Sequence, residues 1–460
     1  MGVSHSLLIC IVSVSPVSRG WALETDDESG LTPTRLLAGV TVVGLDDTDS
    51  RETGMCTTYA ATRLAASIRD AGGTVERLLL VRLNPAVEHK TRGNAALAVH
   101  TDIDASRATD LVRETLDLAQ TDDPKTNPGA VVADCDPSSV PPQVASFTTD
   151  AIRSIQDTTT ATLLADTVGF ARIEQGNGRG LVGALAAVGA WAGLDDWTYE
   201  HIAYREQSRW GTERTVDAES VRTAADEHYP TVWDTVDRQS GYPVCVPRTP
   251  CPILYGIRGD DPEACRAVAD AIESEPVARR ATFVTNQGTD VHLQDATVGT
   301  VSEDSAYRVS GTVVDGPATR EGGHVFLTVA DGDARLDCAA FEPTKRFRDR
   351  VRSLREGDRI TVCGEVTDGT LKLEKFAVRE LVRTEPATPT CPDCGGTMSS
   401  AGRDQGYRCR DCSTSADGKV QRPVSRTLEP GWYEVPPVAR RHIAAPLVRA
   451  GFDAPTHPER

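Results

Sequence analysis

The sequence VTVVGLDDTDSRETGMCTTY, residues 40–59, predicts a buried strand that ends in a cluster of acids. Its apolar, β-branched start is typical of such a strand. Three carboxylates follow within four positions, those of Asp46, Asp47 and Asp49. Because like charges this close repel each other, we expect a cation among them, and oxygen ligands of this kind suit Mg²⁺, which proteins usually hold with one or two carboxylates and the phosphates of a nucleotide. The alternative is that the acids only cap a turn.

The residues after the acids predict a helix whose start can bind phosphate. Good helix formers, residues 59–69, follow the run Cys56-Thr57-Thr58 and end at a glycine pair. Free N–H groups and the positive end of the dipole favour an anion at a helix start, and Thr57 or Thr58 can add a hydroxyl. Alternatively, the threonines only cap the helix.

Two loops that contain lysine are further candidates for the same site. The chain has six lysines among its 49 lysine and arginine residues, and two of them stand in similar loops, KTRGN at 90–94 and KTNPG at 125–129. The first loop joins two predicted strands within 75–101. Each loop places a point charge beside hydroxyl, amide and glycine donors, which suits phosphate oxygens or the transition state of phosphoryl transfer. Two solvated loops are the alternative.

Composition limits the classes that fit. A chain of 460 residues predicts three or four domains, and a formal net charge of −18 with few lysines is what a high-salt cytosol favours. The twelve cysteines are spread along the chain and only four have metal spacing, so we expect a reducing cytosol. The apolar run at 7–14 is too short to span a membrane. We expect residues 1–39 to be an unstructured extension that results from a mis-called start, with translation truly beginning near Val40; a weak signal peptide is the alternative.

Residues 250–285 predict a strand, a helix and a strand, the order of half a ferredoxin-like unit. Cys245 and Cys251 have no matching metal pair, so we expect buried thiols. Upstream, the turn GNGRG at 176–180 is a weak phosphate signal because it lacks a Walker lysine. In the small-residue helix after it, Gly183 and Gly189 predict close packing.

Residues 305–382 predict five alternating strands with a helix between the third and fourth. This is the order of the OB-fold, a β-barrel that binds oligonucleotides on one face. The helix is rich in arginine, which either contacts phosphates or pairs with neighbouring acids on a salt-adapted surface.

Four cysteines in two C-x₂-C turns, fourteen residues apart, predict a zinc ribbon; they are Cys391, Cys394, Cys409 and Cys412. All four positions are thiolates, so we expect a structural site, with a redox dithiol as the distant alternative. The tail from Gln421 carries Arg422, Arg426, Arg440 and Arg441, interleaved with Trp432 and Tyr433. That mixture suits single-stranded RNA, and an arm packed on another domain is the equal alternative.

These motifs together resemble one family, the archaeal tRNA(Ile) 2-agmatinylcytidine synthetases. The resemblance runs from Val40 nearly to the end and is carried by GLDDTDS, GMCTTY, RLNP with KTRGN, KTNPG, GRGLVGALAAVGA, PCPILYGIRG, EGGHVF, CAAFEPTK and PGWYEVPPVARRH. It implies a multidomain α+β chain. The expected parts are an extension at 1–39, a kinase-like α/β catalytic domain at 40–195, a ferredoxin-like domain at 196–300, an OB-fold at 301–385, a zinc ribbon at 386–420 and a basic, aromatic arm at 421–460.

The resemblance also implies a reaction. ATP activates the C2 carbonyl of the wobble cytidine in an isoleucine tRNA with a CAU anticodon, and the primary amine of agmatine displaces the phosphate, so that the tRNA reads AUA. It implies ATP, Mg²⁺ and Zn²⁺ as cofactors, a cytoplasmic setting, no membrane and no protein partner. It also implies self-phosphorylation at Thr57.

On this assignment, the catalytic candidates are Asp46, Asp47, Asp49, Thr57, Lys90 and Arg92, and the ATP-binding candidates are Thr58, Asn94, Lys125, Thr126 and Asn127. Two other classes remain open: a non-catalytic nucleic-acid-binding protein built on the OB-fold and zinc ribbon, and a small-molecule kinase. Consumption of agmatine in step with tRNA distinguishes the synthetase from both.

Overall fold

One nine-stranded sheet organises the described residues between 41 and 285. The computed structural model describes residues 40–50, 54–90 and 93–460, so the predicted extension and Arg92 lie outside the described residues. The strand order is β5-β4-β1-β3-β2-β11-β6-β10-β7. The strands are β1 Thr41–Asp46, β2 Val75–Arg82, β3 Ala95–Thr101, β4 Gly129–Asp134, β5 Ala171–Glu174, β6 Thr198–Arg205, β7 Val232–Trp233, β10 Ile253–Gly259 and β11 Val277–Thr285.

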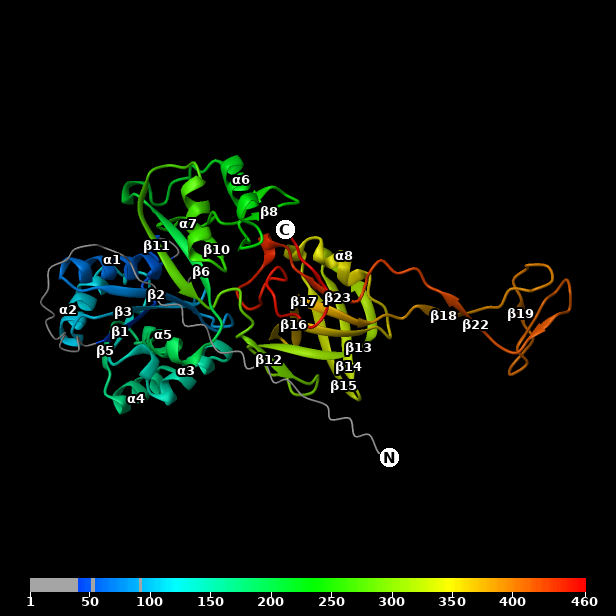
Figure 1. Ribbon diagram of the computed structural model, residues 1–460. Coiled ribbons are helices and arrows are strands. Elements are labelled where there is room, and N and C mark those ends of the chain that lie inside the picture. Colours follow the sequence, from blue (N-terminus) through cyan, green and yellow to red (C-terminus); the bar gives the residue numbers. More distant parts are fainter. Residues whose placement is uncertain (1–39, 51–53, 91–92) are drawn as a thin grey trace, which may run out of the picture. The chain divides into compact units, whose positions relative to one another are not determined.

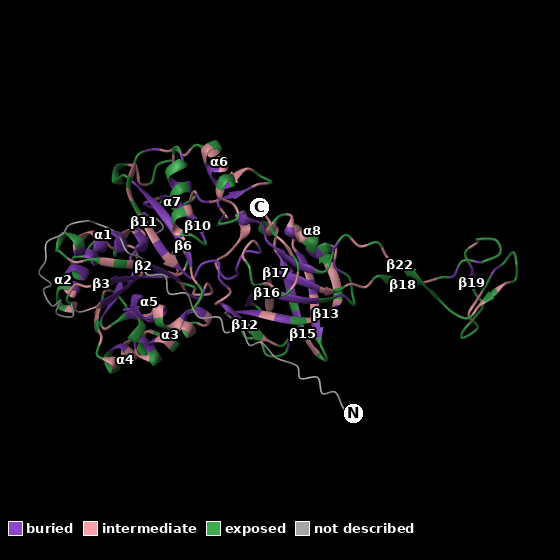
Figure 2. Ribbon diagram, in the orientation of Figure 1, coloured by how far each residue is buried: buried purple, intermediate pink, exposed green. Residues whose placement is uncertain are grey.

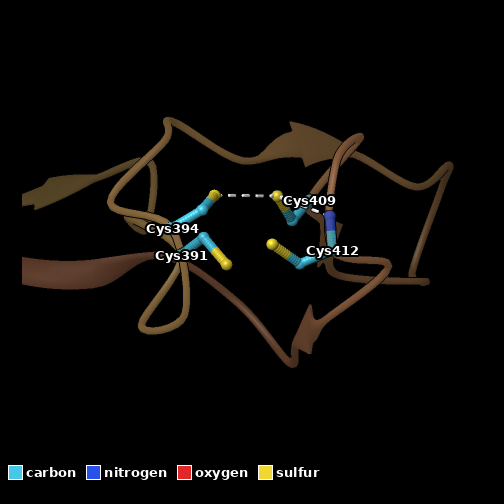
Figure 3. A group of neighbouring side chains, drawn as sticks. All are labelled: Cys391, Cys394, Cys409 and Cys412. Atoms are coloured by element: carbon cyan, nitrogen blue, oxygen red, sulfur yellow. Dashed lines mark hydrogen bonds between the residues drawn. The ribbon is translucent and has the colours of Figure 1, made fainter.

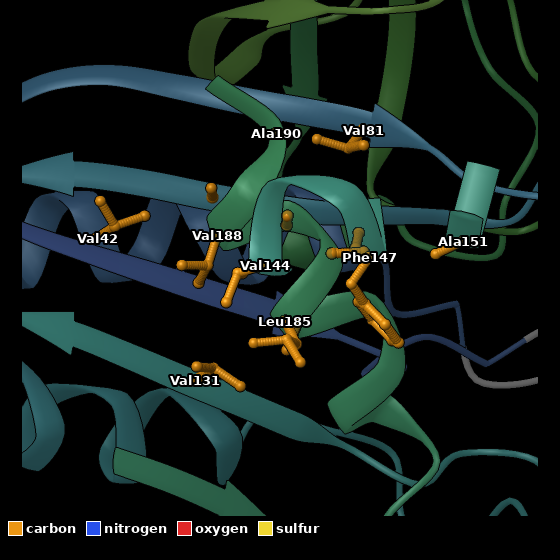
Figure 4. Close-up of a cluster of buried hydrophobic side chains, with 14 of the residues drawn as sticks. Val42, Val81, Val131, Val144, Phe147, Ala151, Leu185, Val188 and Ala190 are labelled. Atoms are coloured by element: carbon orange, nitrogen blue, oxygen red, sulfur yellow. The ribbon is translucent and has the colours of Figure 1, made fainter. Parts of the chain in front are cut away.

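Helices cover both faces of this sheet (Figure 1). They are α1 Thr57–Asp70, α2 Ala105–Leu116, α3 Pro142–Arg153, α4 Thr158–Val168, α5 Gly180–Gly193, α6 Ala218–His228 and α7 Pro262–Ala271. Successive residues of a strand point to opposite faces. Val42 therefore packs in the core beneath α3 and α5, shown in Figure 4, whereas Val43 packs in the core beneath α1 and α2.

Glycine lets α5 lie unusually close to the sheet. A Cβ on Gly44 of β1 would stand 2.0 Å from the carbonyl oxygen of Ala184, and a Cβ on Gly189 would stand 2.5 Å from Thr148 Oγ1. The close packing predicted for Gly183 and Gly189 is confirmed. As a result, the start of α5 reaches the end of β1, where the acids lie.

The two halves of the sheet meet at a short parallel pairing. β2 and β11 pair at Leu79 with Val284 and at Leu80 with Thr285, while every other neighbouring pair in this sheet is antiparallel. The predicted strand–helix–strand order at 250–285 is confirmed as β10, α7 and β11. One continuous sheet thus joins strands from the regions 40–195 and 196–300.

The second sheet contains the five strands predicted between 305 and 382. These are β13 Ser305–Thr319, β14 Val325–Asp331, β15 Ala334–Ala340, β16 Arg359–Thr367 and β17 Thr370–Glu380, with α8 Phe347–Arg352 between the third and fourth. β13 pairs with β14 and β16, and β17 pairs with β15 and β16, so the pairings form a closed circuit. β12 Leu293–Ala296, β23 Gly431–Glu434 and β24 Thr456–His457 extend it.

Short elements complete the chain. A two-stranded ribbon, made of β18 Thr384–Ala387 and β22 Val420–Pro423, leads to and from the cysteine turns, and Figure 2 shows that this region is mostly exposed. The remaining short strands are β8 Val236–Asp237, β9 Tyr242–Pro243, β19 Ser399–Ser400, β20 Tyr407–Arg408 and β21 Ser415–Ala416. The 3₁₀ turns are η1 Pro137–Ser139, η2 Gln207–Arg209, η3 Glu321–Gly323, η4 Glu342–Thr344 and η5 Pro437–Ala439. Among the described residues, no helix is both long and apolar enough to cross a membrane.

Candidate active site

A cavity of about 700 Å³ opens where β1 ends and α1 begins. Seven of the predicted site residues line it: Asp46, Asp47, Asp49, Thr57, Thr58, Lys90 and Asn94. Residues far away in the sequence, from β6, β10 and the C-terminal arm, line it as well. The structure therefore brings the acidic strand end, the start of α1 and Lys90 and Asn94 of the first lysine loop to one place.

Asp46 and Asp47 are held differently, although they are adjacent. Asp46 Oδ1 accepts a hydrogen bond of 2.7 Å from the Asp47 backbone N–H. Its Oδ2 faces α5, where a Cβ on Gly183 would stand 1.9 Å away, so only glycine leaves room for this carboxylate. Asp47 Oδ2 accepts from Arg179 Nη2 at 2.9 Å and from the Asn127 N–H at 3.1 Å. Arg179 thus gives Asp47 a counter-charge within the protein.

The electrostatics of both carboxylates favour protonation. Burial and then the charge of Asp47 raise the pKa of Asp46 well above its ordinary value. Burial also raises the pKa of Asp47 to about 6, against the opposing effect of Arg179. A cation bound here would reverse this tendency, because it favours the ionised form of a nearby carboxylate.

Thr57 begins α1 with its hydroxyl already oriented. Thr48 Oγ1 donates to Thr57 Oγ1 at 3.1 Å, and both side chains are buried. Thr57 therefore accepts this bond and keeps its own proton for another acceptor. The sulfur of Cys56, the residue that precedes the helix, lies 3.1 Å from Thr58 Oγ1. The predicted helix is confirmed, with its first turn facing the cavity.

The two lysine loops have different surroundings. Lys90 lines the cavity and donates to the carbonyls of Pro85 and Val87. Lys125 is exposed and does not line the cavity.

Thr126 and Asn127, beside Lys125, are buried and bonded within the protein. Thr126 Oγ1 donates to the Asp49 carbonyl at 2.7 Å, and Asn127 Oδ1 accepts from the Asn177 N–H at 3.0 Å. This second loop therefore holds the backbone of Asp49 and the side chain of Asp47 in place.

Sequence reasoning missed several residues of the cavity wall. Arg179 belongs to the GNGRG turn, where a lone arginine among glycines was the available signal. Glu200 of β6, Arg82 of β2, Arg258 of β10 and His442 of the C-terminal arm carry no local motif, and only the fold brings them together. Burial, then the nearby charge of Arg82, lowers the pKa of His442 well below its ordinary value.

The four predicted zinc ligands do converge. One sulfur from each of Cys391, Cys394, Cys409 and Cys412 lies within 4.8 Å of the others, as Figure 3 shows. The Cys394 backbone N–H lowers the pKa of Cys391 to about 7, which favours the thiolate that binds zinc. The set suits a closed tetrahedral site.

The aspartates do not form a comparable cluster. Within residues 40–50, 54–90 and 93–460, the cysteines are the only group of three or more ligand atoms this close together. The carboxylate oxygens of Asp46, Asp47 and Asp49 therefore do not by themselves converge as the four cysteine sulfurs do.

For the arginines of the tail, the structure favours the packed-arm interpretation over RNA contact. Arg440 pairs with Asp234 at 2.7 Å and with Glu434, while Arg441 pairs with Glu365 and Glu374. Trp432 and Tyr433 are buried in the second sheet. Arg422 alone of these arginines is largely exposed, where it pairs with Glu385. Likewise, three arginines of or next to α8 have acidic partners: Arg346 pairs with Asp237, Arg348 with Glu342 and Arg352 with Asp349.

Family models match most of the chain. The TiaS TCKD domain matches residues 42–177, the TiaS FLD domain 178–292, the OB-fold nucleic acid binding domain 307–374 and the TiaS C-terminal zinc ribbon domain 388–428. The predictions of an OB-fold and of a zinc ribbon are confirmed.

Curated relatives match this chain over all or nearly all of their own length. A Haloquadratum walsbyi protein, named as the 2-agmatinylcytidine synthetase TiaS of an isoleucine tRNA, is 54% identical over 462 residues, 92% of this chain and 100% of that protein. A Methanosarcina mazei protein of the same name is 46% identical, over 89% of this chain and 97% of its own.

Solved structures have the same fold. The crystal structure of TiaS in complex with its isoleucine tRNA and ATP is similar with a TM-score of 0.83 and 41% identity, and covers 92% of this chain and 100% of that one. A complex of TiaS with the same tRNA, AMPCPP and agmatine has a TM-score of 0.81, 39% identity and the same coverage. The fold around the cavity is thus shared with proteins crystallised with a nucleotide.

Proposed function

The chain belongs to the TiaS family of tRNA(Ile) 2-agmatinylcytidine synthetases, and we propose on that basis that it joins agmatine to C2 of the wobble cytidine of an isoleucine tRNA in an ATP-dependent reaction. The observation that carries the proposal is the meeting of the acids, Thr57 and Lys90 in one cavity within a chain that is 54% identical to a named synthetase. The partners are agmatine and the isoleucine tRNA with a CAU anticodon.

The chemistry follows from what the cavity offers. Phosphoryl transfer to the C2 oxygen of cytosine turns a poor leaving group into phosphate. The primary amine of agmatine then attacks C2, a C–N bond forms, and the C–O bond breaks as phosphate leaves. Such a reaction depends on positioning and on charge stabilisation more than on covalent help from the protein.

We propose that Asp46, Asp47 and Asp49 hold the magnesium of the nucleotide. The donor set fits, because carboxylates crowded in a buried place resist ionisation unless a cation joins them. When bound, Mg²⁺ would neutralise phosphate charge. Because Arg179 already pairs with Oδ2 of Asp47, Asp47 would bind the ion through Oδ1.

The remaining roles are proposals of the same kind. Thr57 is the acceptor of self-phosphorylation, and Lys90 with Arg92 stabilises charge on the transferred phosphoryl group. Thr58 and Asn94 contact ATP from the cavity wall. For Lys125, Thr126 and Asn127 we keep a role at the nucleotide, which Thr126 and Asn127 exert through the backbone of Asp49 and the GNGRG turn.

We propose that residues 40–195 act as a kinase-like domain, 196–300 as a ferredoxin-like domain and the closed strand circuit within 301–385 as an OB-fold barrel. Residues 386–420 form the zinc ribbon and 421–460 the arm. The buried thiols Cys245 and Cys251 suit a reducing, cytoplasmic setting.

The test uses purified protein, a transcript of the isoleucine tRNA with a CAU anticodon, ATP, Mg²⁺ and radiolabelled agmatine. We expect label to enter the tRNA at the wobble cytidine only when ATP is present. ATP turnover that does not depend on agmatine and tRNA would instead indicate a small-molecule kinase, and tRNA binding without turnover would indicate a non-catalytic binding protein.

A further inference from the structure

Glu200 is a buried acid in the cavity that the roles assigned above leave unused. It lies in β6, an interior strand of the first sheet, with Arg258 of β10 and Phe283 of β11 as its neighbours across the two adjacent strands. The residue is 5% exposed, yet it lines the cavity. Its Oε2 accepts no hydrogen bond from any residue that the structure describes.

The surroundings of Glu200 hold its carboxylate in place. A Cβ on Gly256 would stand 2.7 Å from Glu200 Oε1, so glycine leaves the space that the carboxylate occupies. Arg258 Nε donates to Oε1 at 3.3 Å. Arg82 Nη2 lies 3.7 Å from Oε2, close enough for an ion pair but beyond hydrogen-bond distance, while Arg82 Nε donates to Gln287 Oε1 at 2.8 Å.

A buried carboxylate oxygen without a donor is costly unless a ligand supplies one. The ligand that completes this site must offer a hydrogen-bond donor to Oε2, next to acceptors for the two arginines that line the same cavity. A phosphate has acceptors only and would be repelled by the carboxylate. The guanidinium of agmatine has donors only, and would be a third cation beside one carboxylate.

The Watson–Crick edge of cytosine presents the required combination, an exocyclic amine beside the N3 acceptor. We infer that Glu200 reads the exocyclic amine of the wobble cytosine once that base has left its stack, while Arg82 or Arg258 donates to N3. Uracil presents O4 and N3–H there instead, so it meets the carboxylate with an acceptor and the arginines with a donor. Glu200 is then the residue that restricts the reaction to cytidine, an inference that rests on the proposed function.

The test compares Glu200→Gln with the parent on two transcripts, one with cytidine and one with uridine at the wobble position. At saturating ATP and agmatine, we expect kcat/KM for the cytidine transcript to fall about tenfold to a hundredfold, the usual range for one lost base contact. We also expect the ratio of cytidine to uridine turnover to narrow, since an amide can donate to O4.

Glu275→Gln is the matched control. Glu275 is equally buried and paired with an arginine, Arg205, at 2.6 Å, but it does not line the cavity. It should leave the cytidine-to-uridine ratio unchanged. If Glu200→Gln does not fold, the parent is tested on a transcript that carries pyrimidin-2-one riboside, which lacks only the exocyclic amine, and the same loss is expected.

Three results would overturn the inference: an unchanged ratio in Glu200→Gln, equal turnover of cytidine and pyrimidin-2-one by the parent, or a rise in KM for agmatine alone. The last result would assign Glu200 to the guanidinium. A parent that modifies no transcript at all would refute the proposed function instead, so the two failures are distinguishable.

Discussion

Asp47 carries its charge at a cost in the folded protein. Its ordinary pKa is 3.8, and burial raises it to about 6. Between these values the unfolded chain has released the proton that the folded chain keeps, so the free energy of unfolding falls as the pH rises through this window. The two-unit difference corresponds to about 3 kcal/mol lost above pH 6.

Asp47→Asn should therefore raise stability while it removes activity. Without metal or nucleotide, we expect the variant to unfold at a higher temperature than the parent at about pH 7 to 8 and at a similar temperature near pH 4, because the amide mimics the protonated acid. Turnover should fall by about two orders of magnitude or more if the carboxylate serves the magnesium site. Thermal unfolding across pH and agmatine transfer measure the two effects.

Asp123→Asn is the control with the opposite sign. A hydrogen bond from Ser50 lowers the pKa of Asp123, so its charge is favourable in the folded state and its loss should give no gain at neutral pH. If Asp47→Asn is less stable than the parent at about pH 8, or keeps parental turnover at limiting Mg²⁺, the acid is a turn cap and not a metal ligand.

Thr57→Ala removes only a hydroxyl from the start of α1. We expect ATP to bind as in the parent and self-labelling from radiolabelled ATP to vanish, because no acceptor oxygen remains at this position. The buried Thr48 hydroxyl loses its partner, which costs about 1 kcal/mol of stability. Thr57→Ser should restore the label, and persistent label in the alanine variant would place the acceptor elsewhere.

At the scale of helices and strands, the spacing of apolar residues along the sequence predicts the elements well. The strand before the acids, the helix at 57–70, the strands at 75–82 and 95–101 and the five strands around α8 all have the apolar period of their element, and the structure confirms them. The zinc cysteines are close in sequence and equally visible. Arg179, Glu200 and His442 have no such period, because their place in the cavity depends on which strands become neighbours.

Cys391→Ser tests the independence of one element. Three thiolates hold zinc weakly, so we expect the variant to lose its zinc and residues 391–412 to lose their fold, since structural zinc supplies the folding free energy of so small a module. ATP binding and self-labelling at the distant cavity should continue. Metal analysis and radiolabel transfer are the measurements, and a variant that retains one zinc per chain would contradict the assignment of Cys391 as a ligand.

Across the whole molecule, buried ion pairs attach the C-terminal arm to both sheets. Arg440, with a side chain only 6% exposed, lies between Asp234, the residue after β7 of the first sheet, and Glu434 of β23 in the second sheet. Arg440→Ala removes the positive charge that lies between two buried carboxylates, and we expect a loss of about 3 to 5 kcal/mol. Arg422→Ala removes an exposed pair with Glu385 and should cost less than about 1 kcal/mol.

Denaturant unfolding of these two variants ranks the interpretations of the tail. An arm packed on the protein predicts a large loss for Arg440→Ala and a small one for Arg422→Ala. Equally small losses in the free energy of unfolding, together with weaker tRNA binding by both variants, would instead indicate that the tail arginines contact RNA.

We infer that agmatine is joined to tRNA in the acidic cavity. The most direct measurement incubates the parent and Asp46→Asn with ATP, Mg²⁺, radiolabelled agmatine and the isoleucine tRNA with a CAU anticodon, and maps the label by nuclease digestion. We predict one agmatine per tRNA at the wobble cytidine with the parent, and none without ATP or with Asp46→Asn. Labelling that proceeds without ATP, or at parental rate in Asp46→Asn, would contradict it.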